Sequence, residues 1–479
     1  IQTQIVEDVR ALYKPDWTRR ALWDRQYSEA WRPNVPVMLL ELLSHQNLAD
    51  MRYGLDPRFR FDVSRAIYKG MLRFQAVREG RPYVVQPLPV SHFALRHKDG
   101  GMLELSWEPV ADPLEPEAIP TGYKVYRRSG DRGWDQGVRV SRPSLTLPLP
   151  AGDTSCDFKV TALNGGGESF PGEILSAGFV ENSKGTVLIV NAFDRVCGPA
   201  VFDSPERAGI EWWHDRGVPW LRETTFIGDQ YDFNRKKPWT DDDNPGWGSS
   251  FTDMEDLLFP GNSFDFPRIH GKAFNKAGYS YVSVSDEVFA REDFDASGYA
   301  AVDILLGEEK STPSLKDPAV ADFAIYTPGF MRKISEIAGA GGNILVTGAY
   351  PGTELMESGD SLALRFANEK LHFLPRTGHA SRTGHFYPTD YGKEWFTVRG
   401  KFNTGYSPEI YGVESPDGIE PAGKGAFTAF RYGDNHISAG VAWKGPYRTL
   451  VLGFPLETLE DEETRVTLVK QIMDFFGSH

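Results

Sequence analysis

The spacing of apolar residues divides the chain into three regions. Near the start, Ile1, Ile5 and Val9 recur at the interval of an amphipathic helix. Alternating apolar and polar residues follow over 84–178, and longer aliphatic runs separated by helical patterns occupy 184–479. Because 479 residues exceed what one core usually serves, we expect a multidomain chain with boundaries at 1–78, 84–178 and 184–479.

The second region has the pattern of an antiparallel β-sandwich, since short segments alternate at period two between turn residues. The expected strands are Met102–Trp107, Gly122–Arg128, Ser144–Leu149 and Asp157–Leu163. The inward positions of these strands supply a core, which we expect to contain Trp107, Tyr123, Val125, Phe158, Val160 and Ala162.

The third region predicts a doubly wound α/β domain, because continuous aliphatic runs are typical of parallel strands covered on both faces. The expected strands are Gly185–Asn191, Ala301–Leu306, Asn343–Thr347 and Arg448–Gly453. Helical patterns cover Gly329–Ala338 and Glu462–Phe476, and a β-rich insertion lies between about 370 and 445.

A single carboxylate, Glu41, follows the apolar run Val37–Leu40 in the first region. The run has the length and composition of a buried strand, so Glu41 would stand at the strand end where α/β folds place their chemistry. Such a carboxylate is either a catalytic acid or base, or a structural group satisfied by backbone donors.

The residues around Glu41 resemble the end of the zinc-dependent N-acetylmuramoyl-L-alanine amidases. That family closes with a strand, a Glu, a loop containing Ser and Asn, an acidic residue and a last helix ending in Gly. The matching residues here are Glu41, Ser44, Asn47, Asp50, a helix from about Phe59, and Gly70. The resemblance implies a partial α/β amidase-like domain in which Glu41 acts with zinc on the attacking water and Asn47 lies at the substrate.

The zinc ligands of that family, two His and a Glu, lie upstream of the first helix, and His45 is the only histidine within 1–78. The resemblance therefore implies zinc in the full-length protein, and we expect its ligands to lie outside this chain. A zinc amidase needs three protein ligands and an open position for water. We expect the chain alone to be inactive unless an N-terminal amidase segment associates with it.

The other two regions also resemble known domains. Leu105–Trp107 and Phe158–Ser169 resemble a fibronectin type III domain, with Cys156 where the corner tyrosine usually stands, and this implies a spacer or interaction role. Gly339–Gly348 and Leu452–Glu457 are similar to class I glutamine amidotransferase-like domains of flavodoxin-like fold. Active members place a Cys on a tight turn, but Thr347–Gly352 contains neither Cys nor Ser at that turn, so a catalytically silent relative is implied.

Aromatic residues gather between Glu211 and Phe266 among Asp, Asn and Gly. Trp212, Trp213 and Trp247 are candidate glycan-stacking residues, although aromatics that fold a long insertion onto the sheet would look the same. His379 and His385 lie on a Gly-containing loop, but a metal site there would need a third ligand that the sequence does not identify.

Charge and cysteine content narrow the classes of partner. The chain has 52 basic and 66 acidic residues, a net charge of −14, and no long basic run, which argues against nucleic acid. No apolar run approaches the ~20 residues of a membrane span. The cysteines, Cys156 and Cys197, fall in different expected domains, so we interpret both as small buried residues rather than a disulfide.

The order of the three parts resembles large bacterial secreted proteins labelled xanthan lyase, which implies a periplasmic or extracellular location. The first hypothesis is a fragment of a cell-wall hydrolase acting on peptidoglycan. The alternatives are a non-catalytic carbohydrate-binding or scaffolding protein, or a polysaccharide-processing protein of the xanthan lyase type.

Overall fold

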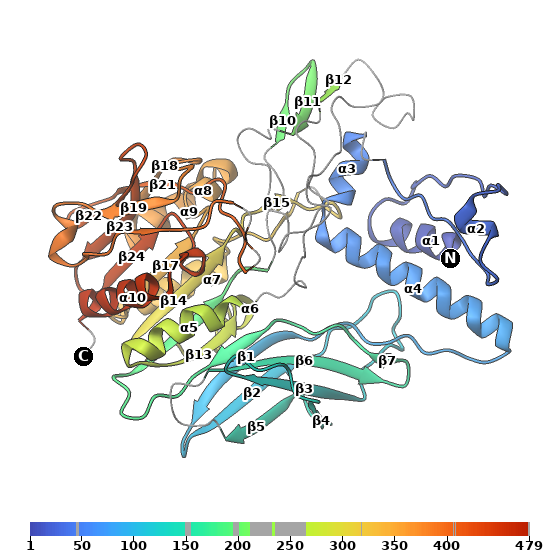
Figure 1. Cartoon of the computed structure of the whole chain (residues 1–479), viewed down its shortest axis with the longest axis horizontal. Coiled ribbons are helices and arrows are strands. Elements are labelled where there is room, and N and C mark those ends of the chain that lie inside the picture. The colour runs from blue at the N-terminus through green and yellow to red at the C-terminus, as the bar shows by residue number, and fades with distance from the viewer. Residues whose placement is uncertain are drawn as a thin grey trace.

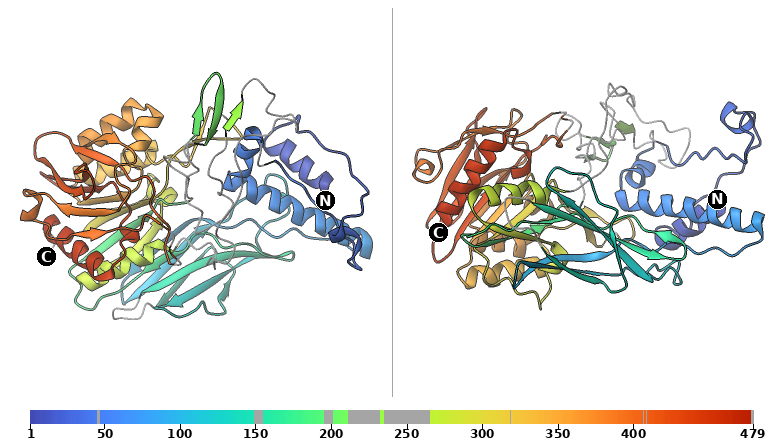
Figure 2. Two further views of the ribbon diagram at one scale, coloured as in Figure 1. Left: turned by 45° about the horizontal axis from the view of Figure 1, so that its top comes forward. Right: turned by 60° about the horizontal axis from the view of Figure 1, so that its bottom comes forward.

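The computed structural model describes residues 1–44, 47–148, 155–194, 201–210, 232–234, 265–317, 319–405, 407 and 409–477. The described chain is multidomain and rich in β-strands, with a helical N-terminal part, a β-sandwich and an α/β part. Two further views place the N-terminal helices and the C-terminus at opposite ends of the molecule (Figure 2).

The N-terminal part consists of helices α1 (Gln2–Leu12), α2 (Ser28–Trp31), α3 (Leu48–Gly54) and α4 (Pro57–Glu79). Helix α1 packs on α4 around a small apolar core of Ile5, Val9, Phe59, Val63 and Ala66. Gly70 permits this approach, since a Cβ there would lie 2.7 Å from the Cα of Ile1. The predicted first helix is confirmed, whereas the helix expected to end at Gly70 continues to Glu79.

The strand predicted over Val37–Leu40 does not form, so this prediction is wrong. The segment belongs to no helix or strand. Val37, Met38 and Leu39 are 41%, 39% and 48% exposed, whereas Leu40 is partly buried against the small apolar core of α1 and α4. The described residues of 1–83 contain no strand that could supply backbone partners. The region is therefore helical in the described structure and is not an α/β domain by itself.

The β-sandwich contains strands β1 (Ser91–Lys98), β2 (Met102–Glu108), β3 (Gly122–Ser129), β4 (Val138–Val140), β5 (Ser144–Pro148), β6 (Cys156–Asn164), β7 (Gly167–Glu168) and β8 (Leu175–Ala177). One layer has the order β1-β2-β5, and the other has β4-β3-β6, with β7 and β8 both paired to β6. All six residues predicted for the core are buried, which confirms the alternation derived from the sequence.

The α/β part is built on five parallel strands in the order β13-β9-β14-β17-β24. Their bounds are β9 Thr186–Asn191, β13 Ser280–Ser285, β14 Ala301–Gly307, β17 Ile344–Gly348 and β24 Arg448–Leu452. Numbered along the chain, this order is 2-1-3-4-5. The four parallel strands predicted from aliphatic runs are present, and β13 is a fifth that was not predicted.

Helices cover both faces of the parallel strands. Helices α5 (Phe266–Ala277) and α10 (Glu462–Phe476) share one apolar core with the sheet, and α7 (Pro328–Gly339) shares the other. The remaining helical turns are α6 Asp286–Phe289, α8 Thr353–Ser358, α9 Ser361–Phe366, η1 Ala367–Leu371, η2 Gly392–Glu394 and η3 Leu456–Thr458.

The expected β-rich insertion is also present. Its strands are β18 Phe373–Thr377, β19 His385–Pro388, β20 Gly400–Lys401, β21 Gly418–Pro421, β22 Ala426–Tyr432 and β23 Ser438–Lys444. Short strands outside the main sheet are β10 Val201–Asp203, β11 Arg207–Ile210, β12 Asp232–Asn234, β15 Thr312–Pro313 and β16 Ala321–Asp322.

The sandwich and the parallel strands are joined in one sheet. Strand β1 pairs antiparallel with β13 through Ala94 and Val284, which gives a continuous sheet of 12 strands. Beside this junction the Ser283 hydroxyl donates to the Ser176 carbonyl at 2.8 Å. A single apolar cluster contains residues of both parts, so they share a core.

Candidate functional sites

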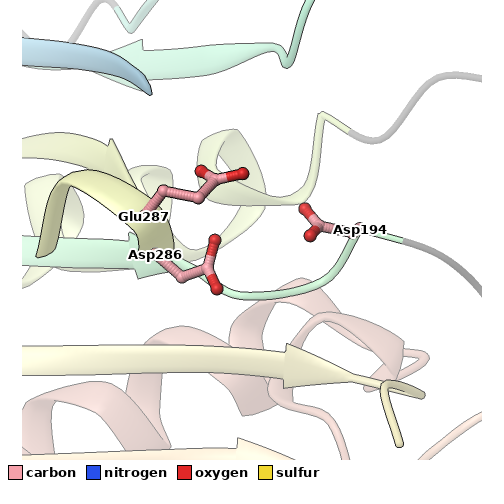
Figure 3. Close-up of side chains that lie close together, drawn as sticks. All are labelled: Asp194, Asp286 and Glu287. Carbon is pink, nitrogen blue, oxygen red and sulfur yellow. The ribbon is translucent and has the colours of Figure 1, made fainter. Parts of the chain in front are cut away.

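Three carboxylates converge at the carboxyl edge of the parallel strands (Figure 3). Asp286 and Glu287 follow β13 directly, and Asp194 lies in the segment that follows β9. One oxygen from each of the three lies within 4.8 Å of the others. Among the described residues, this is the group of His, Cys, Asp or Glu side chains arranged closely enough to share a metal ion.

Further polar groups surround this carboxylate cluster, by which we mean Asp194, Asp286 and Glu287. The backbone N–H of Asp194 donates to Glu309 Oε2 at 2.9 Å, which links the segment after β9 to the end of β14. Asn191, at the last position of β9, donates from Nδ2 to Glu173 Oε2 at 2.9 Å. Five carboxylates from four segments therefore lie at this edge of the sheet.

The acidic groups at this edge disfavour one another's ionisation. Burial, and then the charge of Asp194 and its acidic neighbours, raises the pKa of Asp286 well above its ordinary value. Burial also raises the pKa of Glu173, with further increases from the charges of Glu287 and Asp194. The cluster therefore holds negative charge at a free-energy cost, which a bound cation would relieve.

The oxygen donors of this edge fit a hard divalent cation, because carboxylate and amide oxygens are the ligands that Ca²⁺ and Mg²⁺ prefer. They do not fit the zinc expected for the full-length protein, since zinc sites are built largely from His and Cys. The described residues of this group include neither type. The expectation of zinc in the full-length protein stays a prediction.

Glu41 and Asn47, the residues predicted for the amidase site, lie apart from the carboxylate cluster. Glu41 is exposed in a segment that belongs to no helix or strand. Asn47 is 7% exposed and caps helix α3, its Oδ1 accepting from the N–H groups of Ala49 at 2.9 Å and Asp50 at 3.2 Å. Asp50 in turn accepts from the Ser44 N–H at 2.8 Å. The Ser44, Asn47 and Asp50 pattern thus forms the start of a helix.

The other predicted site residues divide between described and undescribed segments. Trp212, Trp213, Trp247 and Cys197 lie outside the described residues. The Nδ1 of His379 lies 2.8 Å from the Ser415 hydroxyl, and His385 is exposed at the start of β19. Neither histidine belongs to a group of three close ligands within the described structure.

A second cluster of titratable groups is fully buried. His270 on α5 lies between Asp303 on β14, at 2.7 Å from Nδ1, and Glu457 in η3, at 3.1 Å from Nε2. The Tyr411 hydroxyl donates to the other oxygen of Glu457 at 2.7 Å. The side chains of all three charged groups are 0% exposed, so this network has no access for a substrate and stabilises the fold.

Comparison with known proteins gives a weak likeness over about a fifth of the chain. No protein-family model and no curated protein matches it. The twitchin kinase region from C. elegans is 21% identical with a TM-score of 0.17, covering 19% of this chain and 16% of that one. Titin domains A168–A170 are 25% identical with a TM-score of 0.18, covering 20% and 33%. A fibronectin type III domain from human KIAA0970 protein is 16% identical with a TM-score of 0.17, covering 19% and 73%.

Part of the chain is similar to these structures, and the similarity says nothing about its activity. The sandwich is described here from its own strand pairing. No helix of the described residues is long and apolar enough to cross a membrane, as expected from the sequence.

The carboxylate cluster was not predicted from the sequence, although a signal for it existed. Ser280–Ser285 alternates apolar residues with serine and ends directly before Asp286 and Glu287. An acidic pair directly after a buried strand is typical of a site at the carboxyl edge of a parallel sheet. Asp194 lies three residues after the last residue of the predicted strand Gly185–Asn191.

Proposed function

We propose that residues 1–79 are the last part of an amidase-type domain, and that the chain takes part in zinc-dependent peptidoglycan hydrolysis once a segment carrying the zinc ligands pairs with residues 35–42. The observation that carries this proposal is the exposure of an apolar segment with the composition of a central strand. Val35 is 65% exposed and Leu42 is 36% exposed. Between them Val37, Met38 and Leu39 are also exposed, and only Leu40 packs against the core of α1 and α4.

The order of elements supports the proposal. Helices α1 and α2 are followed by the apolar segment, then Glu41, then a short loop that leads to Asn47 at the start of α3, and then the long helix α4. A run of consecutive apolar residues is suited to the middle of a parallel sheet, where both faces of a strand are covered. It is poorly suited to water, because several apolar side chains remain in contact with solvent.

In the completed domain Glu41 would be the proton acceptor. Zinc, held by the complementing segment, would lower the pKa of a bound water and polarise the amide carbonyl. Glu41 would stand at the end of the newly paired strand, where a carboxylate can take a proton from the attacking water. The corresponding substrate is the amide bond of peptidoglycan, and the corresponding location is periplasmic or extracellular.

The test compares this chain with a longer polypeptide that includes the upstream coding sequence. Release of soluble fragments from peptidoglycan in the presence of zinc should occur for the longer form only. Glu41→Gln should lower that activity by at least 100-fold, because it removes the proton acceptor while keeping the size of the side chain. Glu29→Gln, which changes an exposed carboxylate in α2, is the matched control and should keep full activity.

Hydrogen exchange provides a second measurement that does not depend on activity. The backbone amides of residues 37–42 should become protected in the longer polypeptide, because strand pairing would give them hydrogen-bond partners. An inactive longer form with unprotected amides in this segment contradicts the proposal.

The alternative is a scaffolding or carbohydrate-binding role, including polysaccharide processing of the xanthan lyase type. The observation that favours a scaffold is the shared core and continuous sheet of the sandwich and the α/β part, which fix their relative position. Co-sedimentation of the inactive chain with insoluble peptidoglycan, reduced by Trp212→Ala or Trp247→Ala, would favour this role over hydrolysis.

A further inference from the structure

We propose that the carboxylate cluster of Asp194, Asp286 and Glu287 binds a calcium ion at the carboxyl edge of the parallel sheet. This site is independent of the proposed amidase function, since it lies in the α/β part and uses none of the residues of the N-terminal helices.

The first support is the spacing of the donors. One carboxylate oxygen from each residue lies within 4.8 Å of the other two, and oxygen ligands bind Ca²⁺ at ~2.3–2.6 Å. Two ligands on opposite sides of one ion are therefore separated by at most about 5 Å, so all three oxygens can reach the same ion without rearrangement of the backbone. Figure 3 shows the three carboxylates facing a common space.

The second support is an unsatisfied amide beside the cluster. Asn191 is 1% exposed, and its Nδ2 donates to Glu173, which lies near Glu287 and Asp194. Its Oδ1 is buried without a hydrogen-bond partner among the described residues. The Oδ1 of Asp286 is likewise buried and has no hydrogen-bond partner among the described residues. Buried oxygen atoms normally accept hydrogen bonds, and a cation would satisfy these two.

The third support is the position in the sheet. In open parallel sheets ligands bind beyond the carboxyl ends of the strands, where the strand order reverses. For the order β13-β9-β14-β17-β24, that point lies between β9 and β14, so Asp194 borders it and Asp286 and Glu287 lie one strand away, after β13. The segment carrying Asp194 starts at the end of β9, and it is tied to the end of β14 through Glu309.

The number of carboxylates favours calcium over magnesium. Mg²⁺ in proteins usually keeps several waters and binds one or two carboxylates, whereas Ca²⁺ accepts six to eight oxygens in flexible geometry. Here three carboxylates can bind directly, and Asn191 and Glu173 lie next to them. Extracellular Ca²⁺ modules have dissociation constants of ~10⁻⁴–10⁻³ M, and we expect a value near the lower end of this range here.

The test is calorimetric titration of the complete chain with CaCl₂ after removal of metals with EDTA, together with thermal unfolding. We expect one Ca²⁺ per chain and a rise in Tm of ~2 °C at 2 mM Ca²⁺, because the ion binds the folded state only. Glu287→Gln should weaken Ca²⁺ binding by at least tenfold. Because the Glu287 side chain is exposed, this variant should still fold, and the weaker binding would not result from unfolding. Asp286→Asn should weaken binding further and should raise the Tm of the metal-free protein, since it removes repulsion within the cluster.

Glu181→Gln is the matched control, because it removes one exposed carboxylate at a distance in sequence from the cluster and should bind Ca²⁺ as the wild type does. The proposal is wrong if the wild type shows neither binding heat nor a change in Tm up to 10 mM Ca²⁺. It is also wrong if Glu287→Gln and Asp286→Asn both bind as tightly as the control. Tighter binding of Mg²⁺ than of Ca²⁺ would overturn the choice of ion.

Discussion

At the scale of single residues, His270 shows how a buried group becomes charged. Burial alone lowers the pKa of an imidazole, but the charges of Asp303 and Glu457 and their hydrogen bonds outweigh this and raise the pKa of His270 to about 9. The imidazolium therefore neutralises part of the charge of two carboxylates that water cannot reach. The network connects α5, β14 and η3, three segments far apart in the sequence.

This arrangement predicts a loss of stability in alkaline solution. The pKa of His270 is about 9 in the folded state and near 6.5 in the unfolded chain, so the folded state holds the proton more tightly. The stabilisation is complete below pH ~6.5 and is lost as the pH rises through about 9, at a total of about 3 kcal/mol.

Urea unfolding at pH 6.5 and 9.5 measures this loss. A variant with neutral replacements at all three positions, His270→Gln, Asp303→Asn and Glu457→Gln, should lose about 3 kcal/mol less than the wild type between these values. If the free energy of unfolding fell by the same amount in both proteins between these pH values, the His270 network would not be the cause of the alkaline loss of stability.

At the scale of elements, continuous apolar runs correctly predicted β9, β14, β17 and β24. Two predictions failed: β13 was missed, and the strand expected over 37–40 does not form. Strand β13 was not predicted because Ser280 and Ser283 interrupt its apolar pattern. Both serines are buried, and Ser283 is accepted in the core because it hydrogen-bonds Ser176 of the sandwich. That partner is 107 residues away, so local pattern could not supply it.

The segment over 37–40 illustrates the opposite error. Its apolar composition favours a buried strand, but a strand requires neighbours that pair with its backbone, and the described residues provide none. The carboxylate cluster escaped prediction for a related reason. Its members come from segments whose proximity depends on the strand order of the sheet, which no single segment encodes.

Helix α5 packs so closely on strand β13 that there is no space for a side chain at Gly271. A Cβ at this position would lie 2.0 Å from a ring atom of Tyr281, whose hydroxyl is 2.8 Å from the Ser176 hydroxyl. Gly271→Ala should lower the free energy of unfolding by ~1–3 kcal/mol or more, although alanine is the better helix former. Chemical denaturation of the complete chain measures the change.

The matched control is Gly339→Ala at the end of α7, where a Cβ would meet nothing within 4 Å. That substitution should be neutral or stabilising by up to ~1 kcal/mol. Equal effects at both positions would mean that the contact between α5 and β13 is looser than described.

At the scale of the whole molecule, the sandwich and the α/β part are expected to unfold together. They share an apolar core and a sheet, and buried ion pairs attach the N-terminal helices to the sandwich. Lys69 is 2% exposed and lies 3.0 Å from Glu115, and Arg65 lies 2.7 Å from Asp112. Breaking such pairs leaves a buried charge without its partner, so these contacts resist separation.

Native-state hydrogen exchange tests this cooperativity. The slowest amides of β3 in the sandwich and of β14 in the parallel sheet should exchange through one opening, with the same free energy and the same dependence on denaturant. Gly271→Ala should lower both free energies equally. If the free energy of opening were several kcal/mol lower for the slowest amides of β3 than for those of β14, the two parts would open independently.

The pairing of β1 with β13 also determines which strand edges face other molecules. Without β1, the hydrogen-bonding groups of β13 would form an open edge, a template for pairing with strands of other chains. The outer edges of the 12-stranded sheet are instead β5, which ends at Pro148, and β20, which has two residues and includes Lys401. Short strands, proline and lysine are features that discourage pairing between sheets. The sandwich therefore protects the α/β part from edge-to-edge aggregation, and a chain that lost residues 84–178 would expose that edge.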